Sequence, residues 1–172
     1  MNLKNRFLQR VLVAAALIGA AAGAANAEHV KFDAVVASQG DVSLEFADGS
    51  QHVIRLVQRE GPTKGEGPLS GATLLEWGMH DMNPGKGVAD GTGYLVATAS
   101  AGDIAYLKYQ WRAIMATGHD GKAMPLLGGQ WEVVGATGKF KGLTGLGTLR
   151  IEVLDGTRRH WMFEGDLIPS TR

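Results

Sequence analysis

The chain has 172 residues, and its 17 basic and 17 acidic residues give a formal net charge of zero at pH 7. It contains no cysteine, which excludes disulfides, thiolate catalysis and cysteine-ligated zinc. It also has no basic run, so nucleic acid is not an expected partner.

The first 27 residues have the layout of a secretory signal peptide. Lys4, Arg6 and Arg10 precede an uncharged apolar run, which ends in Ala25-Asn26-Ala27. This ending predicts cleavage after Ala27 and a periplasmic or secreted protein. The alternative is a transmembrane anchor, but an uncharged run of 17 residues from 11 to 27 is short for a membrane span. We expect no stable membrane insertion after the signal is cleaved.

Residues 28–172 form the predicted mature chain, a single domain large enough for a hydrophobic core. Without the three basic residues of the signal, the acidic side chains outnumber the basic ones by three. Of the 25 glycines, 23 lie in this part and are dispersed between short β-type runs. Such spacing is typical of strands joined by tight turns and differs from low-complexity disorder.

The first half of the mature chain predicts four short strands separated by turn residues. They span residues 29–37, 42–46, 53–58 and 72–82. The segment Glu60–Ser70 holds two prolines and three glycines, which predicts one long solvated loop. A lid over a barrel mouth is the alternative for this loop.

The second half predicts longer strands with clear alternation. They span residues 91–99, 104–115, 131–134, 143–153 and 157–167. Residues 117–122 are expected to form a turn built around Asp120-Gly121, and Asp155-Gly156 suits a tight hairpin turn. No segment shows a sustained period of 3.6 residues, so we expect little helix.

These elements predict an all-β fold with about eight or nine strands, most of them joined by hairpins. An antiparallel meander of this size closes into an eight-stranded up-and-down barrel, because closure removes exposed strand edges. The interior of such a barrel is either filled by side chains or holds one small ligand.

A glycine-rich stretch from 128 to 153 resembles the signature of the allene-oxide-cyclase/dirigent-like barrel group. In that group an aromatic strand leads into a Gly-Gly-Thr-Gly-x-Phe turn and then a glycine-spaced strand. The matching residues here are Trp131, Val134, Gly135, Thr137, Gly138, Phe140, Gly142, Gly145 and Gly147. Ala136 stands in place of the second glycine, and a weaker resemblance covers residues 71–168.

The resemblance implies a calycin-like barrel that acts without a metal or redox cofactor. Allene oxide cyclases fold a fatty-acid epoxide for ring closure, and dirigent proteins orient phenoxy radicals. The catalytic acids of the plant proteins match no motif in this chain, so no role is transferred to any residue. The resemblance also implies that the chain can form a homo-oligomer in which the outer walls of the barrels pack together.

Glu76 and His80 are candidates for acid–base chemistry. They lie four residues apart, so a strand places both side chains on one face. Pointing into a dry interior, a carboxylate and an imidazole would form a plausible pair. The favoured interpretation is the opposite one, with Trp77 and Met79 facing inward and the polar pair facing solvent.

His160 and Glu164 repeat this spacing on the last strand and are expected to face solvent, opposite Trp161 and Phe163. Arg159 shares the side of these two aromatic residues, so it is expected to point inward or to lie at the rim. No two histidines have a convincing ligand spacing, and no metal site is expected.

Large aromatic side chains make up the candidate ligand-binding set. Its members are Trp77, Tyr109, Trp111, Trp131, Trp161 and Phe163. Four tryptophans in a small chain are most often core residues, and in a barrel that is not fully packed they line an apolar pocket.

Three functions remain open from the sequence. The first is a barrel that binds a small apolar or aromatic molecule and steers a cyclisation or isomerisation without a cofactor. The second is a lipocalin-like carrier without turnover. The third is a packed barrel that serves as a structural or protein-interaction domain. The contents of the barrel interior are expected to discriminate among them.

Overall fold

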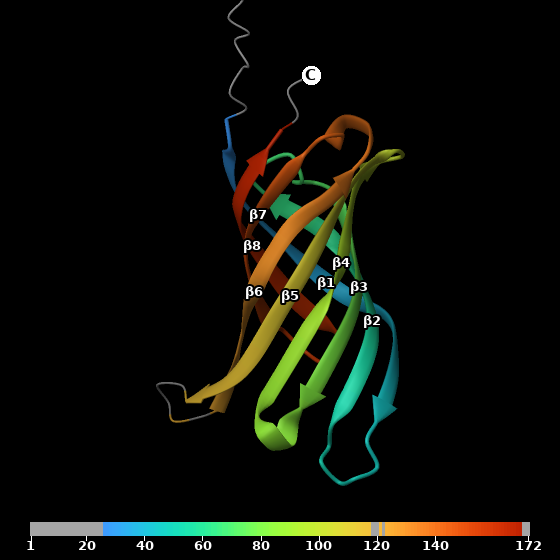
Figure 1. The fold of residues 1–172 in the computed structure, drawn as a ribbon, viewed down its shortest axis with the longest axis vertical. Coiled ribbons are helices and arrows are strands. Elements are labelled where there is room, and N and C mark those ends of the chain that lie inside the picture. The colour runs from blue at the N-terminus through green and yellow to red at the C-terminus, as the bar shows by residue number, and fades with distance from the viewer. Residues whose placement is uncertain (1–25, 118–120, 122, 170–172) are drawn as a thin grey trace, which may run out of the picture.

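Eight antiparallel strands close into one barrel in the computed structural model, which describes residues 26–117, 121 and 123–169 (Figure 1). The strands are β1 (Glu28–Glu45), β2 (Val53–Gly65), β3 (Thr73–Asn83), β4 (Val88–Ser100), β5 (Asp103–Thr117), β6 (Ala123–Ala136), β7 (Thr144–Val153) and β8 (Arg158–Ile168). Two single-turn 3-10 segments, η1 (Pro84–Lys86) and η2 (Gly138–Phe140), lie between strands. The predicted all-β up-and-down barrel is confirmed.

Each strand pairs with its neighbour in sequence, and β1 closes the barrel by pairing with β8. The first half of β1 pairs with β8, from Glu28↔Leu167 to Ala37↔Arg158. On its other edge β1 pairs with β2, from Phe32↔Gly65 to Glu45↔Val53. Because one long strand serves two partners, the strands predicted at 29–37 and 42–46 are a single element. A register shift between Ser38 and Gly40 marks the place where the two predicted strands join.

The predicted loop at Glu60–Ser70 is wrong over its first half, because β2 continues through Gly61 and Pro62 to Gly65. Gly61 suits this position because a Cβ there would overlap the Val35 carbonyl oxygen of the neighbouring strand. Beyond Pro62, the Thr63 N–H donates to the Ala72 carbonyl at 2.8 Å. The connection between β2 and β3 is therefore only residues 66–72. The predicted turn at 117–122 falls mostly outside the described residues, as do residues 1–25 of the predicted signal.

One end of the barrel is sealed by apolar side chains. This sealed end carries the start of β1 and the end of β8, together with the connections β2–β3, β4–β5 and β6–β7 (Figure 1). Leu69 and Phe140, from two of these connections, are buried in the same hydrophobic core as Val30 and Leu167. The opposite, open end carries the connections β1–β2, β3–β4 with η1, β5–β6 and β7–β8.

An aromatic layer fills the barrel next to the sealed end. Phe32 stacks on Phe163 at 4.6 Å between ring centroids, and Trp131 meets Phe32 edge to face at 6.0 Å. Tyr109 contacts Trp161 edge to face at 4.9 Å, nearer the middle of the barrel. All five rings are buried, so this half of the interior is packed solid.

Glycines on the inner face make room for these rings. A Cβ at Gly147 would lie 2.8 Å from Cε2 of Trp131, and one at Gly165 would lie 2.9 Å from its Cζ2. The same Cβ atoms would overlap backbone of the neighbouring strand. Gly147 and Gly165 therefore mark a close approach of β7 and β8.

Among the residues that the structure describes, no helix is long and apolar enough to cross a membrane.

Candidate functional site

The inner face of β3 is polar, which overturns the favoured interpretation of this strand. The side chains of Glu76 and His80 are buried, with residue exposures of 1% and 6%, whereas Trp77 is 54% exposed and Met79 also lies on the outer wall. Gly78, between Glu76 and His80 on the same face, explains the preference. A Cβ there would lie 2.9 Å from Glu76 Oε1 and would overlap the Tyr109 hydroxyl, so the inner face has no room for a large apolar residue at this position.

Glu76 is the centre of a buried hydrogen-bonded cluster, here called the Glu76 cluster, with Arg59, His80 and Tyr109. Arg59 Nη1 donates to Glu76 Oε2 at 3.1 Å, an arrangement that follows from the direct pairing of Arg59 with Glu76 between β2 and β3. Tyr109 donates its hydroxyl hydrogen to Oε1 at 2.6 Å. The Nε2 atom of His80 lies 3.0 Å from the same oxygen, and its protonated form donates to it. Both carboxylate oxygens are thus satisfied.

The cluster controls the protonation of its members. Burial alone would raise the pKa of the Glu76 carboxyl, but the hydrogen bond from His80, the attraction of His80 and Arg59 and the hydrogen bond from Tyr109 outweigh it, so this pKa lies below its usual value. Burial and the charge of Glu76 raise the pKa of Tyr109. Near neutral pH the result is a carboxylate beside a protonated phenol.

A cavity of about 350 Å³ occupies the open end of the barrel. The inner end of the cavity is formed by Arg59 of β2, His80 of β3, Trp111 of β5 and Trp161 of β8. On each of these strands, this is the lining residue that lies farthest from the open end. Apolar side chains form most of its wall: Met82, Val88, Ala89, Ala113, Met115, Leu127, Ile151 and Val153. The interior is therefore packed at one end and open at the other.

Arg159 lies on the cavity lining near the mouth and is half-buried, in agreement with the prediction that it points inward or sits at the rim. Its Nη1 donates to the carbonyl oxygens of Asp155 at 2.6 Å and Arg158 at 2.8 Å. These contacts anchor the guanidinium to the β7–β8 turn. Burial, followed by the like charge of Arg59, lowers the pKa of Arg159.

The aromatic candidates divide into three groups. Trp111 and Trp161 line the cavity. Tyr109, Trp131 and Phe163 are buried core residues outside the cavity lining. Trp77 lies on the outer wall, where it is paired in register with Tyr94 of β4, so the expectation that it contributes to an interior pocket is wrong.

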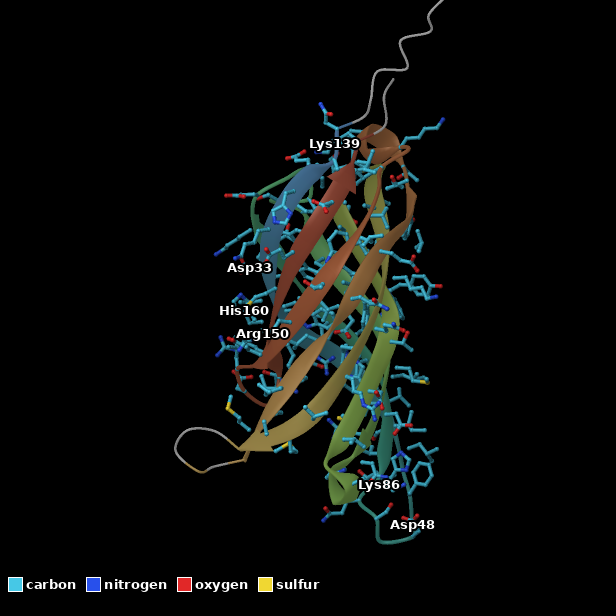
Figure 2. The ribbon with its side chains drawn as sticks, turned by 60° about the vertical axis from the view of Figure 1, so that its left-hand side comes forward. Asp33, Asp48, Lys86, Lys139, Arg150 and His160 are labelled. Carbon is cyan, nitrogen blue, oxygen red and sulfur yellow. The ribbon has the colours of Figure 1, made fainter. Side chains whose placement is uncertain are left out.

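His160 and Glu164 lie on the outer face of β8, as predicted. His160 Nε2 is 2.9 Å from Asp33 Oδ2, and Figure 2 shows these two side chains together on the outer wall. Glu164 is exposed near His29 and Lys31. Neither residue reaches the cavity. Of the five candidate site residues on β3 and β8, the structure joins Glu76 and His80 by a hydrogen bond and places His80 and Arg159 on the cavity lining.

Arg59 is the functional candidate that the sequence did not single out. The sequence feature that could have identified it is its spacing, because Arg55, Val57 and Arg59 are alternate residues and so share one face of the strand. In the structure this is the inner face, and Leu56 lies on the outer one. An arginine on an inner strand face requires a partner, and Glu76 lies directly opposite it.

In the described part of the chain, no group of three or more His, Cys, Asp or Glu side chains is placed to hold a metal ion. No protein-family model, no curated protein and no solved structure matches this chain.

Proposed function

We propose that this protein is a periplasmic or secreted barrel that binds one small apolar or aromatic molecule in the cavity at its open end. The observation that carries the proposal is the cavity itself. Its volume of about 350 Å³ falls within the range of roughly 300–1,000 Å³ of ligand sites. Apolar walls with a few convergent polar groups are the usual composition of such sites.

The resemblance to the allene-oxide-cyclase/dirigent-like group supports the same proposal. The Gly-Ala-Thr-Gly stretch that carries the resemblance forms the end of β6, the residue Thr137 and the start of η2, and Phe140 behind it helps to seal the barrel. These residues close one end of the barrel, and the other end is left for a ligand.

Native mass spectrometry tests the proposal. We expect residues 28–172, purified from the natural source, to carry a small molecule that is lost on denaturation. An Ala113→Phe substitution fills the cavity wall and should abolish its retention, whereas Val134→Phe on the outer wall should not. A bare mass, together with no binding of an apolar dye to the wild type, would instead favour a structural or protein-interaction role.

The Glu76–His80 hydrogen bond favours a second candidate, a cofactor-free isomerase or cyclase. His80 lines the cavity while Glu76 holds its Nε2 at 3.0 Å, which is the arrangement of a base oriented by a carboxylate. The His80 Nδ1 atom has no hydrogen-bond partner among the described residues. In this proposal Nδ1 accepts a proton from the bound molecule, and Glu76 stabilises the resulting imidazolium.

Hydrogen–deuterium exchange into the bound molecule distinguishes an enzyme from a non-catalytic carrier. In D2O, proton abstraction by His80 labels an acidic carbon of the retained molecule, and His80→Gln should stop the labelling without releasing the molecule. His160→Gln on the outer wall is the matched control. A retained molecule with no labelling above the rate without protein would support the lipocalin-like carrier instead.

The proposal also includes export of the protein and cleavage of the predicted signal peptide after Ala27. The strand β1 begins at Glu28, the residue that follows the predicted cleavage site, so the barrel closes without the predicted signal. The intact mass of protein from the periplasm or medium should correspond to residues 28–172. A mass that retains residues 1–27 would contradict cleavage after Ala27.

A further inference from the structure

The charged residues on the cavity lining are all basic. Arg55, Arg59 and Arg159 line the cavity, and no aspartate or glutamate does so. Residues 28–172 carry three more acidic than basic side chains, so the basic lining is opposite in sign to the net charge of the predicted mature chain. Such a lining attracts anions and disfavours cations.

The positive charge of the cavity is only partly neutralised by the barrel. Glu76 is the one carboxylate paired with these arginines in the described part of the chain, and it lies behind the lining, shared with His80 and Tyr109. Arg159 donates to backbone carbonyl oxygens, which carry no net charge. Three guanidinium groups therefore face a largely apolar space, and the one paired carboxylate, Glu76, binds only Arg59 from behind the lining.

Three N–H donors are enclosed without an acceptor. They are Arg59 Nε, Trp111 Nε1 and Trp161 Nε1, and they are the complete set of enclosed, unpartnered side-chain polar atoms in the described residues. All three residues line the cavity. The inner wall of the cavity therefore carries N–H donors without matching acceptors, although the donor atoms themselves are enclosed, with Trp111 Nε1 against Gly91 of β4.

The shape of the cavity restricts the ligand to a compact body. Tyr109, Trp161 and the aromatic layer of Phe32, Trp131 and Phe163 fill the barrel beyond the cavity, so an extended chain cannot enter lengthwise. The lining offers the flat ring systems of Trp111 and Trp161. Flat rings favour a flat partner, because stacked and edge-to-face contacts then add to simple burial.

We propose that the ligand is a compact, flat organic anion, with its carboxylate or similarly acidic oxygens between Arg59 and Arg159 and its apolar body against Trp111 and Trp161. This inference rests on the proposed binding function and names the chemical class that the same cavity takes. Guanidinium groups bind carboxylates through paired, charge-assisted hydrogen bonds, which gives the selectivity its physical basis.

Isothermal titration calorimetry with two probes of the same shape tests the charge requirement. The probes are 2-naphthoate and 2-naphthamide, which share the ring system and differ in the charge of the head group. We expect wild-type residues 28–172 to bind 2-naphthoate about tenfold to a hundredfold more tightly, the range that one or two charge-assisted hydrogen bonds supply. Equal affinity for the two probes would overturn the inference while leaving the binding function intact.

Variants locate the anion. Arg159→Gln should bring the two affinities within about threefold of each other by weakening 2-naphthoate binding alone, and Arg159→Lys should restore part of the preference. Arg150→Gln removes an exposed arginine of the outer wall and should change neither affinity. An unchanged preference in a folded Arg159→Gln variant, checked by circular dichroism, would contradict the assigned position. Binding of neither probe to the wild type would count against the proposed binding function itself.

Discussion

At the scale of single residues, Glu76 is the side chain that holds the buried polar cluster of the barrel together. It is ionised and almost fully enclosed, and three partners from β2, β3 and β5 satisfy its two oxygens. Removing a charge from water is expensive, so a buried carboxylate persists only with such a set of partners. Conversely, Arg59 is buried in an apolar barrel because Glu76 is opposite it.

Replacing Glu76 by Gln should destabilise the folded barrel by roughly 3–5 kcal/mol, because it leaves the Arg59 charge buried without its counterion. Urea denaturation at neutral pH measures the loss. Glu164→Gln is the control, since Glu164 is exposed and its neighbours His29 and Lys31 are exposed too. It should change stability by less than about 0.5 kcal/mol. Similar losses in the two variants would show that the buried pair contributes nothing specific.

Acid should weaken the barrel through the same residue. Because the pKa of Glu76 is lower in the folded state than in the unfolded chain, its contribution to stability is complete above the unfolded pKa and is lost as the pH falls through the folded pKa. Melting temperatures of the wild type should therefore fall below about pH 4–5. Tyr109→Phe removes a hydrogen bond that lowers this pKa, so the decline of the variant should be smaller and should end at a higher pH. Superimposable pH profiles for the two proteins would contradict the assignment.

At the scale of elements, glycine decides which face of a strand turns inward. On β3 the alternation of apolar residues Leu75, Trp77 and Met79 suggested an inner face that is in fact exposed, and Gly78 on the other face was the better guide. Hydrophobic alternation identifies the buried face only when the outer face is polar, and here the outer wall also carries large apolar side chains. Close approach of neighbours inside a narrow barrel, by contrast, demands glycine.

Two adjacent glycines of β6 provide a matched test of this rule. A Cβ at Gly129 would overlap the Gln110 carbonyl oxygen and lie 2.6 Å from the Trp111 Cα, so Gly129→Ala requires backbone movement and should lower stability by about 1–3 kcal/mol. A Cβ at Gly128 would approach only the Leu149 carbonyl oxygen, at 3.8 Å. Gly128→Ala should be neutral or slightly stabilising in thermal denaturation. Equal effects would indicate that the two faces of β6 are equally open.

At the scale of the whole molecule, the two ends of the barrel differ: one is filled with side chains and the other holds a cavity. Connections that carry Leu69 and Phe140 close the end at which β1 begins and β8 ends (Figure 1). The open end retains a cavity. Figure 2 shows Lys139 of η2 at the sealed end and Lys86 of η1 at the opposite one. The packed half supplies stability, and the open half is therefore free to bind a ligand.

Closure by β1 should be essential for folding. A chain that begins at Ser38 lacks Val30, Phe32, Ala34 and Val36, all buried, and leaves the β8 edge without its partner. We expect it to aggregate or to show no cooperative unfolding by circular dichroism, whereas the chain that begins at Glu28 unfolds cooperatively. A cooperative transition at an unchanged temperature in the shorter chain would contradict the closed barrel.

Local patterns in the sequence were sufficient to predict the all-β class, the up-and-down barrel and the inward side of the strands whose outer face is polar. Period-two alternation and glycine turns act locally, so residues such as Leu107 and Trp111 on β5, or Trp161 on β8, were placed correctly. The length of β2 and the inner face of β3 depended on pairing with other strands. Pairing between distant strands brings Arg59 to Glu76 and gathers three arginines on the lining of one cavity. Such juxtapositions arise from barrel register between residues far apart in the chain, which no local pattern records.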